Sequence, residues 1–140
     1  MTPGRILALD LGKRRIGLAL SDELGVTAQG LETLQRTNLR EDMARLAKLA
    51  SGHNVSLILM GNPLHMSGRE GRGAAHAREF GARLEAVTGI PIQLWDERLT
   101  TVQAQRVLRE SGISIEKRAK AVDRLAAVIL LESYLDSCQS

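Results

Sequence analysis

The sequence predicts one α/β domain, in which a mixed sheet of five strands is covered by helices in two or three layers. Two short β-rich runs come first, and helical and strand periodicities alternate after them. The continuous apolar run Val55–Met60 is bounded by a glycine and is typical of a strand buried on both faces. Leading strands followed by alternating helices and strands favour a mixed sheet. A chain of 140 residues without an internal linker predicts a single domain over residues 1–140.

The first three strands are predicted from β-rich runs near the N-terminus. Residues 5–10 and 15–21 are joined by Leu11–Arg14, which is the spacing of an antiparallel hairpin. A third strand is expected over residues 26–34. The sheet therefore starts with adjacent antiparallel strands.

A helix and a central strand follow. Asn38 and Glu41 have the spacing of a helix N-cap and its reciprocal N3 partner, and apolar residues then recur at helical intervals. Gly52 is expected to end this helix, and Val55–Met60 forms the next strand. That strand is expected at the centre of the sheet.

The second half of the chain predicts three helices and a fifth strand. Residues 74–87 read as an amphipathic helix, and residues 90–95 as a strand. Helices are then expected from about 100 to 111 and from about 116 to 136. These elements complete the covering of the sheet.

Composition limits the class of protein. With 44% hydrophobic and 25% charged residues the chain resembles a soluble globular domain, and its apolar runs are too short to cross a bilayer, so we expect a cytoplasmic protein. Aromatic residues make up only 2%, which disfavours base-stacking platforms. The single cysteine, Cys138, excludes an intrachain disulfide and a cysteine zinc cluster. A monomer and a homodimer, with or without a disulfide between chains, both stay open.

The basic residues are grouped near acidic residues rather than spread evenly. The net charge of +3 alone does not identify a nucleic-acid partner. A solvated surface is an equally good interpretation of each group taken singly. The position of these groups beside the acidic residues favours contacts with a nucleic-acid backbone. The residues predicted to make such contacts are Lys13, Arg14, Arg15, Arg69, Arg72, Arg98, Lys120 and Arg124.

Three acidic residues stand at unusual places. Asp10 closes an apolar strand, and Gly12 after it can adopt positive φ and let a ligand backbone approach. Glu97 follows the fifth strand. Asp123 shares a helical face with Ala127 and apolar residues after it, and is therefore expected to point toward the core.

Each acid also has a structural explanation. Asp and Gly are favoured in turns, which would account for Asp10, and Glu97 alone would be an exposed loop charge. Asp123 could instead pair with Arg98 or Arg124. These alternatives stay open for each residue taken singly.

If the three carboxylates converge to about 5 Å, each pair repels by about 3 kcal/mol at an effective dielectric near 20. Bound cations would compensate this repulsion. Hard oxygen ligands without a histidine or cysteine pattern select Mg²⁺ or Mn²⁺ over zinc. One or two such ions held by Asp10, Glu97 and Asp123 would support in-line phosphoryl displacement, which is nuclease chemistry.

The glycine-rich segment 61–73 follows the central strand and carries two arginines. Its backbone amides and guanidinium groups could bind phosphates. It lacks the Gly-Lys-Ser/Thr ending of a Walker loop. A connection without a ligand is an equally good interpretation.

Four motifs together resemble the YqgF/RuvX family, described both as Holliday junction resolvases and as nucleases of ribosomal RNA precursors. The likeness covers almost the whole chain, and the block from Asp96 to Thr101 is its most specific part. The loop departs from the family pattern at His65 and Ser67. The motifs are Leu9-Asp10-Leu11-Gly12 with Arg15-Ile16-Gly17, Gly61-Asn62-Pro63-Leu64 through Gly68, Asp96-Glu97-Arg98-Leu99-Thr100-Thr101, and Lys120-Ala121-Val122-Asp123 with Ala126-Ala127.

The resemblance implies an RNase H-like fold of the RuvC type, with helices packed on both faces of the sheet. It also implies that Asp10, Glu97 and Asp123 are the acidic active-site residues, and that the substrate is the 5′ end of the 16S ribosomal RNA precursor. Three other functions remain open: a structure-selective DNA endonuclease acting on branched junctions, a non-catalytic nucleic-acid adaptor, and an ATP-binding phosphotransfer domain. One short domain disfavours the last, because such enzymes clamp the nucleotide between two domains.

Overall fold

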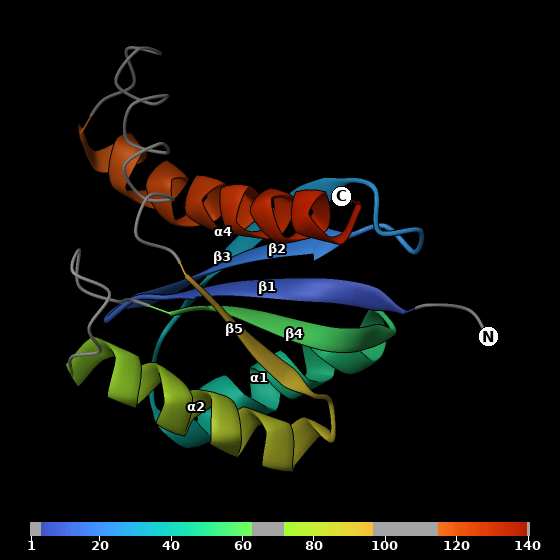
Figure 1. The fold of residues 1–140 in the computed structure, drawn as a ribbon. Helices are drawn as coiled ribbons and strands as arrows, with labels where there is room; N and C mark the ends of the chain where they lie inside the picture. Colours follow the sequence, from blue (N-terminus) through green and yellow to red (C-terminus); the bar gives the residue numbers. More distant parts are fainter. Residues whose placement is uncertain (1–3, 63–71, 97–114, 140) are drawn as a thin grey trace.

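The computed structural model describes residues 4–62, 72–96 and 115–139. Within these residues a five-stranded sheet is covered by helix α4 on one face and by helices α1 and α2 on the other, as Figure 1 shows. The expected α/β fold with a mixed sheet and helices on both faces is confirmed. The described elements are β1 (Arg5–Leu11), β2 (Arg15–Ser21), β3 (Ala28–Gln35), α1 (Leu39–Gly52), β4 (Val55–Asn62), α2 (Arg72–Thr88), β5 (Ile92–Asp96) and α4 (Ile115–Gln139).

The strand order is β3-β2-β1-β4-β5. Strands β1, β2 and β3 pair antiparallel, whereas β4 runs parallel to both β1 and β5. The carboxyl ends of β1, β4 and β5 therefore lie at one edge of the sheet. In α/β sheets this edge is where ligand sites usually form.

The face covered by α1 and α2 contains most of the large core side chains. Leu7 and Leu9 of β1 and Met60 of β4 are fully buried there, together with Phe80 and Leu84 of α2. Successive residues of a strand point to opposite faces, which explains why the odd-numbered residues of β1 all pack on this side. This layer supplies most of the hydrophobic stabilisation.

The face covered by α4 combines leucines with small residues from β1, β2 and the helix. Ala8 of β1 and Ala19 of β2 are completely buried against Ala127 of the helix. Small side chains at the contact let the helix backbone approach the sheet closely. Leu130 and Leu131 continue the same contact further along α4.

The start of α1 agrees with its predicted cap and corrects one detail. The Asn38 side chain accepts a hydrogen bond from the Glu41 amide at 2.9 Å, as an N-cap does. The expected reciprocal bond from Glu41 is replaced, because its carboxylate accepts from the Thr37 hydroxyl at 2.8 Å. The Glu41 carboxylate therefore binds a side-chain hydroxyl instead of the Asn38 backbone amide that a capping box would use.

Four predicted strands need small corrections at their ends. β1 extends to Leu11 and β4 to Asn62, beyond the predicted residues 10 and 60, and β3 ends at Gln35 rather than at residue 34. β3 begins at Ala28 rather than at residue 26, because the backbone amides of Val26 and Thr27 bind the Asp22 carboxylate and close a turn. β5 covers residues 92–96 rather than 90–95.

Two helices extend beyond their predicted bounds. α2 covers residues 72–88 and α4 covers residues 115–139, compared with the expected 74–87 and 116–136. Helix ends are the part that sequence periodicity defines least well. The helix expected from about 100 to 111 lies outside the described residues.

None of the described helices has the length and apolar character needed to cross a membrane.

Candidate active site at the carboxyl edge of the sheet

Asp10 lies near the carboxyl end of β1, where it is half-buried and pairs with Gly17 of β2. Ala8, two residues earlier, packs against α4. Because alternate residues of a strand share a face, Asp10 lies on the α4 face as well. An acidic residue thus extends the row of small buried residues along which α4 packs.

The turn that follows Asp10 joins β1 to β2. Its closing hydrogen bond runs from the Gly12 amide to the Arg15 carbonyl, at 2.9 Å. The expected positive φ at Gly12 is wrong: among the described glycines, only Gly25 and Gly89 have it. Glycine is needed for another reason, since a Cβ at this position would lie 2.6 Å from the Arg15 carbonyl oxygen.

The other two predicted acids are described only in part or not at all. Asp123 lies in α4, one helical turn before Ala127, and its side chain is outside the described residues. Ala127 and Leu130 on that helical face are buried, as expected, at 0% and 1% exposure. Glu97 lies outside the described residues and directly follows Asp96, the last residue of β5.

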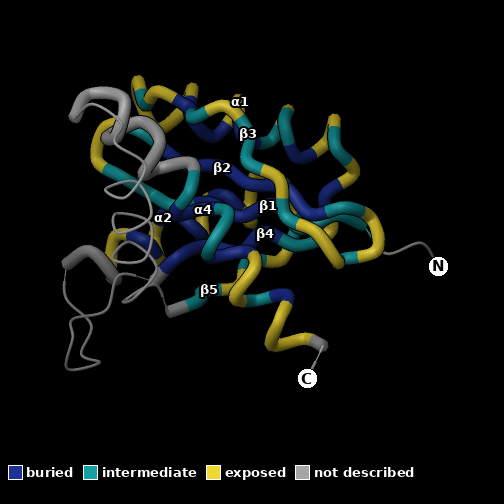
Figure 2. The backbone as a smooth tube through the Cα atoms, turned by 90° about the horizontal axis from the view of Figure 1, so that it is seen from above, coloured by how far each residue is buried: buried dark blue, intermediate teal, exposed yellow. Residues whose placement is uncertain are grey.

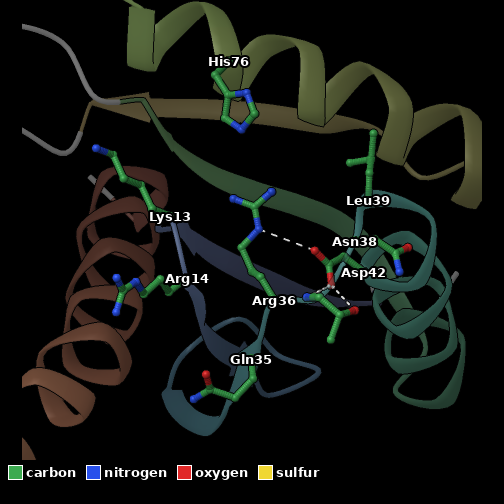
Figure 3. A pocket seen from close by; sticks show the side chains of 9 residues that line it. Lys13, Arg14, Gln35, Arg36, Asn38, Leu39, Asp42 and His76 are labelled. Atoms are coloured by element: carbon green, nitrogen blue, oxygen red, sulfur yellow. Dashed lines mark hydrogen bonds and ion pairs between the residues drawn. The ribbon is translucent and has the colours of Figure 1, made fainter.

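An open cleft lies beside the turn that follows Asp10, and Figure 3 shows the side chains around it. It has a volume of about 610 Å³ and lies between this turn, the end of β3 and the first turns of α1 and α2. Four of its lining residues carry a basic or imidazole group. They are Lys13, Arg14, Arg36 and His76, and the remaining lining residues are Gln35, Thr37, Asn38, Leu39 and Asp42.

An ion pair with a buried carboxylate lines this cleft. The side chain of Asp42 is 1% exposed and its carboxylate lies 3.5 Å from Nε of Arg36. The same carboxylate accepts a hydrogen bond from the Thr37 amide at 3.1 Å. A buried carboxylate needs such partners, since an unpaired buried charge is strongly destabilising.

Arg36 connects this ion pair to the turn after Asp10. Its Nη1 donates to the Gly12 carbonyl at 2.8 Å, and its guanidinium lies 5.5 Å from the ring centroid of Phe80. Its backbone amide donates to the Arg14 carbonyl at 2.8 Å. Sequence analysis missed both Arg36 and Asp42; an acid in the first turn of α1 has an ordinary explanation as a helix-dipole partner.

The predicted nucleic-acid contacts are only partly brought together. Lys13 and Arg14 are exposed and line the cleft, while Arg15 is half-buried at the start of β2. Arg72 begins α2, and Lys120 and Arg124 lie in α4, with their side chains outside the described residues. Arg69 and Arg98 lie wholly outside them.

The described side chains contain no group of three His, Cys, Asp or Glu residues that could hold a metal ion. This leaves the predicted trio untested, because Asp10 alone among its members has a described side chain. The donor set fits a hard cation, since all three members offer carboxylate oxygens.

Proteins of similar sequence carry one name. The chain is 53% identical to a protein of Koribacter versatilis over 95% of this chain and 87% of that one, and 45% identical to a protein of Myxococcus xanthus over 95% and 88%. A protein of Lachnospira eligens is 46% identical over 96% of this chain and 99% of its own. Each is named "Putative pre-16S rRNA nuclease".

Solved structures of similar fold include two Holliday junction complexes. Thermus thermophilus RuvC with its junction substrate matches with a TM-score of 0.62 over 97% of this chain and 96% of that one, at 13% identity. Fowlpox virus resolvase with junction DNA matches with a TM-score of 0.59, covering 97% and 99%, at 14% identity. At these identities the likeness concerns the fold, and it confirms the expected RNase H-like architecture of the RuvC type.

The family model described as "RuvX: Holliday junction resolvase" matches residues 4–137. That match covers β1 through α4, and so includes Asp10, the cleft and the small-residue face of the sheet. Together with the relatives above, it shows that this chain belongs to the RuvX family.

Proposed function

We propose that this protein is a metal-dependent nuclease that hydrolyses phosphodiester bonds at the 5′ end of the 16S ribosomal RNA precursor. The observation that carries this proposal is the position of Asp10, half-buried at the carboxyl edge of the sheet and on the face covered by α4. The names of the relatives at 45–53% identity support the RNA substrate. The protein would act in the cytoplasm as a single domain, either as a monomer or as a homodimer.

Strand register supports an approach of Glu97 to Asp10. Leu9 pairs with Met60 and Met60 with Leu94, so Asp10 is level with Trp95 on β5, two strands away. Two strand spacings amount to about 10 Å. Trp95 packs with the α4 cluster, and a strand continued beyond Asp96 would bring Glu97 to the same face.

The packing of α4 supports an approach of Asp123. Ala127 packs against Ala8 in the same cluster, and Asp10 follows Ala8 on that face. Helix α4 runs in the direction opposite to β1 (Figure 1), Asp123 precedes Ala127 by one helical turn, and Asp10 follows Ala8 by two residues. We therefore expect the two acids to lie at the same end of this contact. A contact between small residues brings the helix close enough for two acidic side chains to share a ligand.

In this proposal Asp10, Glu97 and Asp123 hold one or two Mg²⁺ or Mn²⁺ ions. Bound there, such ions activate water and stabilise the leaving oxygen of a phosphodiester. The protein's own contribution is to keep three carboxylates at one point, which the β-sheet edge and the α4 packing would do.

The basic side chains of the turn would bind the sugar-phosphate backbone beside the cleaved bond. Lys13 and Arg14 follow Asp10 by three and four residues and line the cleft with His76. The one acid in that cleft, Asp42, is buried and paired, so the accessible surface is basic. The remaining predicted contacts, including Arg69, Arg72, Arg98, Lys120 and Arg124, stay part of this proposal.

The deciding experiment offers the purified protein two substrates with Mg²⁺ or Mn²⁺. One is an RNA carrying the 5′ precursor segment of 16S ribosomal RNA, and the other is a four-way DNA junction. We expect cleavage of the RNA and none by Asp10→Asn, whose circular dichroism and nucleic-acid affinity should match those of the unaltered protein. Undiminished cleavage by Asp10→Asn would remove Asp10 from the mechanism.

The junction arm tests the second candidate function. The family description and the fold likeness to junction-bound RuvC favour a Holliday junction resolvase in recombination or repair. Two symmetric cuts in a junction normally require a symmetric dimer. Selective junction cleavage by a dimer would replace the RNA proposal, whereas binding without cleavage of either substrate would favour a non-catalytic adaptor.

A matched pair of variants tests the phosphate contacts. Lys13→Gln should weaken binding of a single-stranded RNA and lower the salt slope of binding by about one. Lys48→Gln removes another exposed lysine, which is on α1 and does not line the cleft. It should leave the RNA affinity and the salt slope unchanged. Equal effects of the two substitutions would remove Lys13 from the binding surface.

A further inference from the structure

We propose that Arg36 is a positioning residue, which holds the turn after Asp10 in its working geometry by bridging it to α1 and α2. This inference rests on the proposed nuclease function. Arg36 lies 24 residues from Gly12 in sequence, and the contact between them is therefore a product of the fold.

The guanidinium of Arg36 makes three kinds of contact with three elements. Nη1 donates to the Gly12 carbonyl at 2.8 Å, Nε lies 3.5 Å from the Asp42 carboxylate of α1, and the group stands over the Phe80 ring of α2. Figure 3 shows the Arg36 side chain pointing toward Asp42 at the start of α1. A planar fork of donors can serve a carbonyl and a carboxylate simultaneously, which a lysine ammonium does less well.

Asp42 keeps this fork in place. Its carboxylate is fixed by the Thr37 amide at 3.1 Å and by burial at 1% exposure, so Arg36 meets a rigid partner. The Arg36 side chain is itself only 17% exposed. Because both side chains are already fixed by these contacts, holding the turn costs them little further conformational entropy.

The turn is therefore held from both directions. The backbone amide of Arg36 donates to the Arg14 carbonyl, while its side chain holds the Gly12 carbonyl. Gly12 is two residues from Asp10, and its amide closes the turn by bonding to Arg15. A shift of this turn moves the end of β1 that carries Asp10, and small misplacements of reacting groups can cost ~100-fold in rate.

The test compares Arg36→Met with Arg45→Met. Arg45 is the matched control, because its Nη1 also donates to a backbone carbonyl, that of Gln35 at 2.9 Å, without contacting the turn. We expect Arg36→Met to lower kcat about tenfold or more and to change KM less than about twofold, since the bond positions rather than binds. Arg45→Met should leave both constants near those of the unaltered protein.

Arg36→Lys separates positioning from charge. This variant keeps a positive charge in the cleft but lacks the planar guanidinium, so we expect its kcat to stay below that of the unaltered protein. Full recovery of kcat by the lysine, or a loss confined to KM and to the salt slope of RNA binding, would overturn the inference and make Arg36 a phosphate contact. Arg36→Lys also serves where Arg36→Met does not fold.

Amide hydrogen exchange provides a readout that needs no substrate and no metal ion. In the metal-free protein, the Gly12 amide should exchange faster in Arg36→Met than in Arg45→Met, while amides in the middle of β4 stay equally protected. Unchanged exchange at Gly12 overturns the inference even where cleavage is found. Failure of the unaltered protein to cleave any substrate would instead refute the proposed function.

Discussion

The two faces of the sheet are built from side chains of different size. On the α1/α2 face most of the buried side chains are large, whereas on the α4 face three buried alanines, one each from β1, β2 and the helix, lie among four leucines. Figure 2 shows that the central strands are largely buried, and Figure 1 shows the helices on the two faces of the sheet. The large-residue face supplies stability, and the small-residue face sets how closely α4 approaches the strand that carries Asp10.

The difference teaches where this fold can accommodate its catalytic groups. Large side chains bury more apolar area and so stabilise more, at about 25 cal/mol per Å². They also keep backbones apart. A site that needs acidic groups from a strand and a helix to share one ligand therefore belongs on the alanine side, and Asp10 lies there.

The largest expected effect on stability is on the α1/α2 face. Leu84→Ala removes a fully buried side chain from α2 and should destabilise the protein by about 2–5 kcal/mol, because a cavity remains. Chemical denaturation measures this loss. Cleavage at a temperature where the variant is folded should be nearly normal, and a large loss there would break the division between the two faces.

A smaller loss of stability with a larger loss of activity is expected on the α4 face. Ala127→Leu inserts a bulky group between α4 and the small residues Ala8 and Ala19, and overpacking of this kind costs about 1–3 kcal/mol. Because the helix is displaced from the sheet, cleavage should fall further than in Leu84→Ala. Denaturation and turnover measured on both variants make the comparison direct, and normal turnover in Ala127→Leu would contradict it.

The cap of α1 should have an intermediate effect on stability alone. Asn38→Ala removes the acceptor of the Glu41 amide and should cost about 1 kcal/mol, whereas Asn38→Ser keeps an acceptor and should cost less. The midpoint of urea unfolding measures both. Equal midpoints for the two variants would mean that the capping bond does not stabilise α1.

The smallest effect is expected at the turn between β2 and β3. Hydrogen bonds from the amides of Thr27 and Val26 lower the pKa of Asp22 below its usual 3.8. A lowered folded-state pKa stabilises the folded protein at pH values above the unfolded-state pKa. This contribution is lost as the pH falls through the folded-state pKa. Asp22→Asn should therefore flatten the decline of stability below about pH 4. Thermal unfolding measured between neutral pH and pH 3 tests this, and identical acid profiles would contradict it.

Local patterns in the sequence predicted the elements well. The hairpin of β1 and β2, the N-cap at Asn38 and the buried strand β4 all depend on residues close in sequence, and each is present. Asp10 could be identified because an acid that closes an apolar strand breaks a local pattern. Its partners Glu97 and Asp123 remain predictions, since their side chains lie outside the described residues.

Contacts between distant elements could not be predicted in the same way. Asp42 is an ordinary helix-start acid in sequence, and only the fold buries it beside Arg36. His76 is on an exposed helix surface, and the fold alone brings it to the same cleft as Lys13.

The sequence by itself determined the order and type of the described elements and the acid at the end of β1, because periodicity and capping act over a few residues. The tertiary structure alone decided that Arg36 reaches across to the turn at Gly12, and that its partner Asp42 is buried beside it. Such contacts depend on the distances between packed backbones. Those distances are set by side-chain volumes from many parts of the chain together, and no short segment encodes them.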